Sequence, residues 1–319
     1  MTSVRVRALA KINLDLRVLN QRADGYHDLR TIFQTVSLAD RLEIQYRRGR
    51  TRIDIKSNFN IPDNLIVKAA DSILCATGVT GQLGFVLTKN IPLGGGLGGG
   101  SSDAAAVLLA LPRLIKRPLA YGKLLELAES LGSDVPFFLL GGTAAAIGRG
   151  TELFPLPDRP SRNALLITPG LHVSTADAYR ALARELTSTP PVNMMNDFQK
   201  VVWSIGVARE AEEWDVENDF EKVVFDQYPQ LKLIKGKLLK LGARPALMSG
   251  SGSTIYGIFP AKSVRDRAAR RLRRELPASE ILPVTLVSRK RYRALWRGQM
   301  GIPVGDELWQ WQPQGRYAE

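Results

Sequence analysis

Six glycines lie within the stretch Leu93-Gly-Gly-Gly-Leu-Gly-Gly-Gly-Ser-Ser102. Glycine has no Cβ, so its backbone turns freely and its N–H groups can approach a ligand closely. The apolar run that follows predicts a helix over 101–111, whose first N–H groups and positive dipole end attract anions. We therefore predict a phosphate-binding loop between a strand at 83–87 and this helix, with Ser101 and Ser102 as its cap.

Two well-known nucleotide-binding patterns do not fit this loop. Gly94, Gly96 and Gly99 satisfy the spacing Gly-x-Gly-x-x-Gly, but no acidic residue follows about 20 positions later to hold a ribose. The P-loop pattern fails because no Lys-Ser or Lys-Thr pair follows the last glycine. A phosphate loop of another architecture remains, with a flexible linker or a structural turn as the alternative.

Phosphoryl transfer would need a group that accepts a hydroxyl proton and a cation that neutralises the moving phosphoryl. Every even position from Val4 to Val18 is apolar, which predicts a long strand or a hairpin with one buried face, and Lys11 and Asn13 share the other face. Asp134 lies in a turn after a predicted helix. By residue type alone, a surface lysine and a turn-forming or capping aspartate explain both residues equally well.

Three separated motifs resemble those of the GHMP kinases, in the order that this family has them. They are Ala10-Lys-Ile-Asn-Leu14, the glycine stretch from Pro92 to Ser102, and Met248-Ser-Gly-Ser-Gly-Ser-Thr254. The resemblance covers roughly residues 4–290. It implies an α+β, two-domain GHMP kinase fold, in which an N-terminal ribosomal S5 domain 2-like domain precedes a C-terminal ferredoxin-like domain.

The segment Arg22-Ala-Asp-Gly-Tyr-His27 narrows the resemblance to the branch that acts on 4-diphosphocytidyl-2-C-methyl-D-erythritol. The implied activity is ATP-dependent phosphorylation of the 2-hydroxyl of this alcohol, giving ADP and the 2-phosphate, in the non-mevalonate (MEP) route to isoprenoid precursors. Another GHMP kinase with a different small alcohol is one alternative. An RNA-binding protein with an S5-like fold is the other, and salt-dependent RNA affinity without ATP turnover would favour it.

The resemblance also implies roles for individual residues. Lys11 and Asp134 correspond to the catalytic pair. The expected ATP contacts are Asn64, Lys89, Gly94, Gly95, Gly96, Leu97, Gly98, Gly99, Gly100, Ser101 and Ser102. The expected contacts to the cytidyl substrate are Asn13, Tyr26, His27, Tyr179, Gly250, Ser251 and Gly252.

Each of the weaker assignments has a purely structural alternative. Tyr26 and His27 could be an ordinary half-buried hairpin pair, although stacking by Tyr26 and Tyr179 and base reading by His27 would suit a cytosine. Asn64 could simply cap a helix, and the loop 249–253 could be a hairpin turn. Mg²⁺ is expected to arrive with ATP, but no dedicated metal ligand can be read from the sequence.

The chain of 319 residues, 45% of them hydrophobic, is long enough for two domains. A proline-rich stretch at 154–160 marks the boundary, so we predict an N-terminal kinase domain at 1–158, a C-terminal domain at 159–290 and an extension at 291–319. The extension is rich in aromatic residues, and composition leaves open whether it packs on the body, mediates a dimer or is disordered.

The remaining elements follow from periodicity and turn signals. Pro112 should end or kink the helix after the glycine loop, and Ser174 with Asp177 forms a capping box. Asn196-Asp-Phe and Asn218-Asp-Phe echo one another, and position favours Asn218 as the counterpart of the family's Asn-Asp segment. The predicted helices lie at 64–77, 121–131, 174–186, 228–241 and 261–275, and the strands at 37–46, 52–57, 164–168, 245–248, 253–259 and 281–287.

Composition also limits the cofactors and partners. Cys75 is the single cysteine and there are two histidines, so neither a disulfide nor a zinc site is supported. The sequence contains no membrane-length apolar run and no signal-peptide pattern, so a cytoplasmic protein is expected. The net charge of +13 is concentrated towards the C-terminal end, where the arginines at 265–274 read as a solvated helix face. We expect ATP and a cytidine-diphosphate substrate as ligands, no nucleic acid, and a monomer or homodimer.

Overall fold

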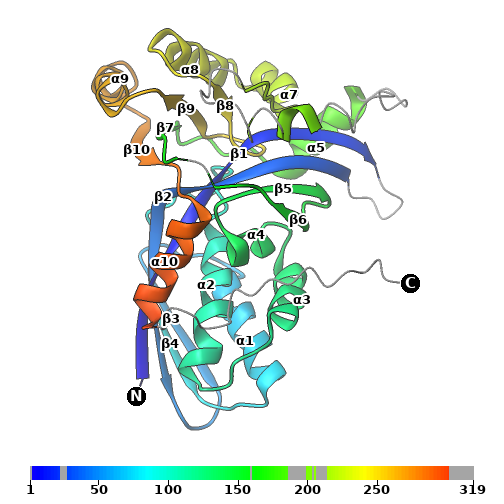
Figure 1. The fold of residues 1–319 in the computed structure, drawn as a ribbon, viewed down its shortest axis with the longest axis vertical. Helices are drawn as coiled ribbons and strands as arrows, with labels where there is room; N and C mark the ends of the chain where they lie inside the picture. Colours follow the sequence, from blue (N-terminus) through cyan, green and yellow to red (C-terminus); the bar gives the residue numbers. More distant parts are fainter. Residues whose placement is uncertain are drawn as a thin grey trace.

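Two long antiparallel strands run through the molecule and take part in both of its halves (Figure 1). β1 (Thr2–Gln21) pairs with β2 (His27–Arg47) from Thr2 opposite Tyr46 to Gln21 opposite His27. The computed structural model describes residues 2–21, 27–158, 160–185, 199–202, 205 and 214–301. None of the helices in these ranges combines the length and apolar character needed to cross a membrane.

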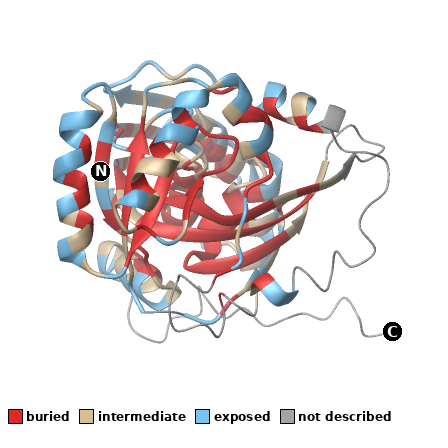
Figure 2. Cartoon of the chain, turned by 90° about the horizontal axis from the view of Figure 1, so that it is seen from above, coloured by how far each residue is buried: buried red, intermediate tan, exposed pale blue. Residues whose placement is uncertain are grey.

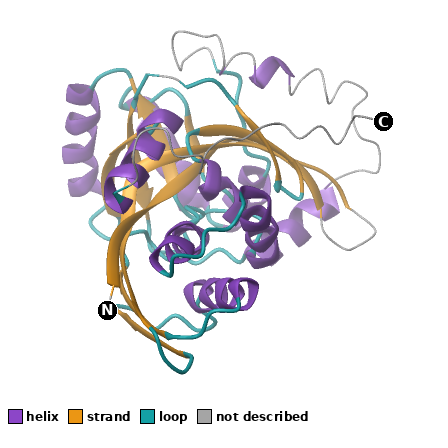
Figure 3. Ribbon diagram, turned by 60° about the horizontal axis from the view of Figure 1, so that its bottom comes forward, coloured by secondary structure: helices purple, strands orange, loops and turns teal. Residues whose placement is uncertain are grey.

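The N-terminal half is a mixed sheet with helices packed in its concave side (Figure 3). The strand order is β3-β4-β2-β5-β6, and β1 also pairs with β2. Helix α2 packs against α1, α3, α4 and β1, and its apolar side chains are buried. The remaining elements are β3 (Arg52–Ser57), α1 (Leu65–Thr77), β4 (Gln82–Thr88), α2 (Gly99–Leu114), α3 (Tyr121–Leu131), α4 (Val135–Leu140), β5 (Thr143–Gly148) and β6 (Glu152–Pro155).

The C-terminal half has the strand order β10-β7-β9-β8, with every pair antiparallel. A helical segment lies between the first two strands and one helix between the last two, which is the ferredoxin-like arrangement predicted from the sequence. Alternate residues of β7 face opposite cores: Leu165 and Ile167 meet the helices, whereas Ala164 and Leu166 meet β1. Its elements are β7 (Asn163–Thr168), α5 (Thr175–Glu185), α7 (Phe220–Gln227), α8 (Pro229–Lys240), β8 (Ala246–Met248), β9 (Ile255–Phe259), α9 (Lys262–Glu275) and β10 (Glu280–Thr285).

The middle of β1 is buried on both faces, whereas the alternating pattern predicted one buried face. Every residue from Ala8 to Leu16 is buried, and Figure 2 shows the strands crossing the interior in the buried colour. Ala10 and Ile12 pack on the C-terminal sheet. The other face, which carries Lys11, is covered by the glycine stretch, because the Lys11 N–H donates to the Leu97 carbonyl at 3.0 Å.

Part of the predicted extension is an ordered helix of the N-terminal half. Helix α10 (Arg289–Met300) packs against β1, and its Tyr292 and Trp296 are buried in the N-terminal core. The Tyr292 hydroxyl donates to the Phe138 carbonyl of α4 at 2.5 Å. Packing on the body, one of the three possibilities left open by composition, therefore describes this helix, and residues 302–319 lie outside the described residues.

Helix α2 departs from its predicted boundaries at both ends. It begins at Gly99, with Gly98 as the N-cap residue in the left-handed conformation, so Ser101 and Ser102 lie inside the helix and do not cap it. At the other end it continues past Pro112 to Leu114, because Pro112 lies in the last turn, where the loss of one N–H costs little of the helix. The six-residue helix α4 was not predicted, since it is too short for a periodic pattern.

Candidate active site

The glycine stretch turns three times through backbone conformations that favour glycine before it enters α2. Gly94, Gly96 and Gly98 have φ angles of 67°, 75° and 69°. The N-cap position of α2 carries no side chain that bonds its first N–H groups, because the N-cap residue is itself a glycine. Those N–H groups and the helix dipole are thus available to an anion, as a phosphate loop requires.

A second loop of small residues, 249–254 between β8 and β9, lies directly on the glycine stretch. The Ser249 hydroxyl donates to the Gly96 carbonyl at 2.9 Å, and the Thr254 N–H donates to the Gly95 carbonyl at 3.3 Å. A Cβ built on Gly96 would lie 2.0 Å from the Ser249 carbonyl oxygen. The two loops, which come from the two halves of the chain, therefore meet through their backbones.

Lys11 and Asp134 lie together beside these loops. Lys11 Nζ is 3.4 Å from Asp134 Oδ2, and the Lys11 side chain is 4% exposed whereas that of Asp134 is 33% exposed. Asp134 occupies the N-cap position of α4, but its side chain makes no capping hydrogen bond. Its carboxylate therefore faces a lysine and solvent, so the capping alternative raised by the sequence does not account for it.

A chain of hydrogen bonds fixes the lysine from the side of β1. Lys11 Nζ donates to Asn13 Oδ1 at 2.7 Å, Asn13 Nδ2 donates to the Thr31 hydroxyl at 2.8 Å, and this hydroxyl donates to the Asp15 carbonyl at 2.6 Å. The ammonium also lies 5.3 Å from the centre of the Phe33 ring. Because all its neighbours are held by β1 and β2, Lys11 has little freedom to move away from Asp134.

Two of the three predicted cytosine contacts can be placed. The rings of His27 and Tyr179 are stacked with their centres 5.1 Å apart and 22° between their planes, and Phe220 meets Tyr179 edge-on at 4.8 Å. Burial raises the pKa of the Tyr179 hydroxyl to about 12, and the charge of Asp134 adds to the increase. Tyr26 lies outside the described residues.

The direct stack differs from the expected arrangement, in which Tyr179 closes one face of a base. In the structure His27 itself occupies a face of Tyr179. His27 Nε2 is buried and has no hydrogen-bond partner among the described residues. A nitrogen in that position can bond to a ligand without giving up an existing partner.

Lys89 lies under the glycine stretch but does not point into the phosphate loop. Its ammonium bonds to Asp40 and, at 2.8 Å, to Asp103 Oδ2, and its side chain is 1% exposed. Burial acts to lower the pKa of Lys89, but the two carboxylates outweigh this effect and raise it. Burial also raises the pKa of Asp103. Because Asp103 belongs to α2, the ion pairs tie this helix to the sheet.

The other predicted ATP contacts differ in what they face. Asn64 is the N-cap residue of α1 and accepts from the Ile66 N–H at 3.0 Å, as its structural alternative stated. Leu97 is buried. The Ser102 hydroxyl donates to the Leu9 carbonyl at 2.7 Å and is therefore engaged in the core. In contrast, a Cβ on Gly100 would meet only the Leu65 side chain, at 3.9 Å.

Sequence reasoning missed the structural roles of Asp103 and Asn218. Asp103 directly follows the glycine stretch, but nothing in its spacing identifies Lys89 and Asp40 as its neighbours. Asn218 holds the loop 249–254 by two hydrogen bonds from its amide, to Met248 and Gly250. The only sequence signal for it was the unexplained echo at 196–202, which lies mostly outside the described residues.

Comparison with known proteins agrees with this geometry. The GHMP kinase N-terminal domain family matches residues 64–142, and the GHMP kinase C-terminal family matches residues 205–278. A protein from Solibacter usitatus named 4-diphosphocytidyl-2-C-methyl-D-erythritol kinase is 52% identical over 309 residues, 95% of each chain.

Solved structures give the same result. A crystal structure of 4-(cytidine 5'-diphospho)-2C-methyl-D-erythritol kinase has a TM-score of 0.73 and 38% identity, covering 88% of this chain and 98% of that one. A homoserine kinase from Cytophaga hutchinsonii, at 17% identity and a TM-score of 0.68 over 90% of this chain and 95% of its own, shares the fold. The chain therefore belongs to the GHMP kinases, in the family of the 4-diphosphocytidyl-2-C-methyl-D-erythritol kinases.

Proposed function

We propose that this kinase transfers the γ-phosphoryl group of ATP to the 2-hydroxyl of 4-diphosphocytidyl-2-C-methyl-D-erythritol, in the non-mevalonate route to isoprenoid precursors. The observation that carries the proposal is the Lys11–Asp134 pair, 3.4 Å apart, against the glycine stretch. The 52% identity to a relative of that name supports the choice of substrate.

In this proposal Asp134 is the general base. Its carboxylate is part-exposed and uncapped, so a substrate hydroxyl can reach it and donate its proton. As the proton leaves, the 2-oxygen forms its bond to the γ-phosphorus, and the bond between that phosphorus and the leaving ADP oxygen breaks. Lys11 bonds to the attacking oxygen and to the γ-phosphoryl oxygens, where negative charge gathers.

The phosphates of ATP bind on Gly94–Ser102 through backbone N–H groups at the start of α2. Ser102 and Lys89 act in this proposal from below the loop: the Ser102 hydroxyl bonds to β1, and Lys89 anchors α2 through Asp103. Mg²⁺ would enter on the triphosphate. The described residues contain no group of three or more histidine, cysteine, aspartate or glutamate side chains that could hold it, so no step is assigned to a protein-bound metal.

The cytidyl group binds at His27 and Tyr179, with Tyr26 on the adjoining segment. The unpartnered His27 Nε2 meets the hydrogen-bonding edge of the base, and the aromatic rings supply its stacking surface. Entry of the base requires the His27–Tyr179 stack to open. Gly250, Ser251 and Gly252 then close on the diphosphate, beside Asn13.

A coupled assay of ADP release tests the proposal, with the cytidyl substrate beside mevalonate and homoserine as alternative alcohols. We expect turnover with the cytidyl substrate alone. Asp134→Asn should lower kcat by at least ~10²-fold, because general-base catalysis contributes about that much, while ATP affinity stays close to that of the parent enzyme. Near-normal kcat in this variant would remove Asp134 from the mechanism.

A further inference from the structure

Asn218 joins three backbone segments through one buried side chain. Its Nδ2 donates to the Met248 carbonyl at 2.7 Å and to the Gly250 carbonyl at 2.8 Å, and its Oδ1 accepts from the Phe220 N–H at 3.0 Å. The residue is 4% exposed. All the hydrogen-bonding capacity of the amide nitrogen is thus spent on the loop that lies on the glycine stretch.

The residues on either side of Asn218 are fixed to the catalytic strand. The Glu217 N–H donates to Asp15 Oδ1 at 3.0 Å, and the Glu217 carbonyl accepts from the Leu16 N–H at 2.8 Å. Asp219 donates its N–H to the Leu16 carbonyl at 3.0 Å and accepts from the Val18 N–H at 3.0 Å. The segment 217–219 therefore follows any movement of β1, the strand that carries Lys11.

A second set of bonds joins the loop to the same region. The Tyr256 hydroxyl, just after the loop, donates to the Asn13 carbonyl at 2.9 Å. The Ser249 hydroxyl reaches the Gly96 carbonyl. The loop 249–252 is thus held from three sides, and Asn218 is the side chain that bonds both to its first glycine and to the end of β8.

From these contacts we propose that Asn218 is a positioning residue for phosphoryl transfer. It sets the position of Gly250–Gly252 relative to Lys11, and so places the diphosphate of the acceptor substrate in register with the catalytic pair. The inference rests on the proposed function, because it assigns the loop 250–252 to that substrate. Capping of α7 alone does not explain the arrangement, since the cap uses Oδ1 and needs neither of the two bonds from Nδ2.

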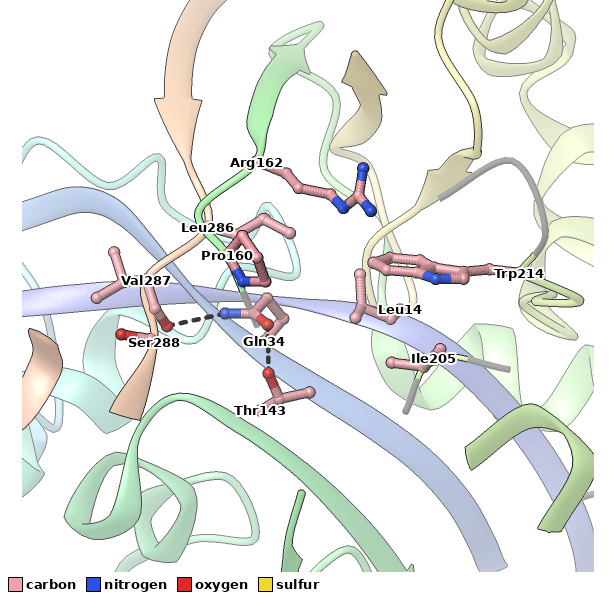
Figure 4. A pocket seen from close by; sticks show the side chains of 10 residues that line it. All are labelled: Leu14, Gln34, Thr143, Pro160, Arg162, Ile205, Trp214, Leu286, Val287 and Ser288. Carbon is pink, nitrogen blue, oxygen red and sulfur yellow. Dashed lines mark hydrogen bonds between the residues drawn. The ribbon is translucent and has the colours of Figure 1, made fainter. Parts of the chain in front are cut away.

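The chain offers a matched control in Gln34 of β2 (Figure 4). Gln34 is also 4% exposed, and its Nε2 likewise donates to two carbonyls, those of Thr35 at 2.8 Å and Val287 at 3.0 Å. Its side chain lines a small cavity with Leu14, Thr143 and Trp214, away from the catalytic pair. Successive strand residues face opposite sides, so Gln34 lies on the other face of β2 from Phe33, which contacts Lys11.

The experiment compares Asn218→Asp with Gln34→Glu, because both exchange a buried amide donor for a carboxylate of the same shape. We expect kcat/KM for the cytidyl substrate to fall by roughly 10²-fold in Asn218→Asp, as for a displacement of about 1 Å at a reacting group. ATP affinity, measured by calorimetry without the acceptor, should change little, and CDP affinity should fall. In Gln34→Glu the melting temperature should fall without loss of kcat/KM.

A second variant, Asn218→Ser, covers the case in which the carboxylate prevents folding, since serine keeps an acceptor for the Phe220 N–H but reaches neither carbonyl. Equal effects of Asn218→Asp and Gln34→Glu on kcat/KM, or normal kcat/KM in a folded Asn218→Ser, would overturn the positioning role. Wild-type enzyme that neither turns over the cytidyl substrate nor binds CDP would overturn the proposed function, and this inference with it.

Discussion

Replacing Gly96 by alanine tests whether the two small-residue loops meet in the active enzyme as they do in the structure. The added Cβ would lie 2.0 Å from the Ser249 carbonyl oxygen and 3.2 Å from that of Gly252. Both obstacles are backbone atoms, which cannot rotate aside as the end of a long side chain can. The loop 249–252 must therefore retreat from the glycine stretch.

The size of the effect follows from this geometry. An ordinary contact needs about 3.4 Å, so the Ser249 carbonyl has to move by roughly 1.4 Å. Displacement of a substrate-positioning group by about 1 Å costs on the order of 10²-fold in rate. Alanine at a φ of 75° also costs ~1–2 kcal/mol of backbone strain. We expect kcat/KM to fall by at least ~10²-fold while the protein remains folded.

The assay is kcat/KM for the cytidyl substrate at saturating ATP, with thermal unfolding as the check on folding. Gly100→Ala is the comparison within the same stretch: a Cβ there meets only Leu65 Cδ1 at 3.9 Å, and its backbone is helical. Its loss should be much smaller and reflect crowding of the ATP phosphates. If the two variants lose equal activity, the contact between Gly96 and Ser249 is not part of the working site.

Two further predictions concern stability. Trp296 is 2% exposed in the N-terminal core, so Trp296→Ala should lower the free energy of unfolding by ~3–5 kcal/mol in urea titrations, and a loss below ~1 kcal/mol would show that α10 is dispensable. Burial raises the pKa of Asp15 from 3.8 to about 6; its proton therefore stabilises the fold fully below about pH 4, and that contribution is lost as the pH rises through about 6. Asp15→Asn should accordingly gain up to ~3 kcal/mol relative to the parent between pH 4.5 and pH 8, and a difference independent of pH would contradict this.

The parts of the fold that follow local patterns were predictable from the sequence. The alternation at 4–18 predicted β1, and the apolar periodicity and turn signals predicted α1, α3 and the elements of the C-terminal half to within a few residues. Local patterns do not report what covers an element. The polar face of β1 therefore read as exposed, although the glycine stretch and the segment 217–219 bury it.

The candidate site was predictable where resemblance supplied the partner, and not where three-dimensional contact decides it. Lys11 and Asp134 were paired by resemblance, and the structure brings them to 3.4 Å. Lys89 was assigned to ATP in the same way, yet Asp40 and Asp103 hold it within the core. Those carboxylates are 49 and 14 residues away in sequence, and neither separation carries a periodic signal.

The position of Lys11 explains why a site with so few charged groups can depend on both halves of the chain. Its backbone N–H bonds to the glycine stretch, and its strand bonds, five residues on, to the segment that carries Asn218. Asn218 in turn bonds to the loop that closes on Gly96. This is a closed circuit, so a shift at any member moves the glycine stretch relative to the loop 249–252. Phosphoryl transfer requires the acceptor oxygen, the phosphorus and the leaving oxygen to lie roughly in line, and in our proposal this circuit holds the two ligand-bearing loops to that geometry.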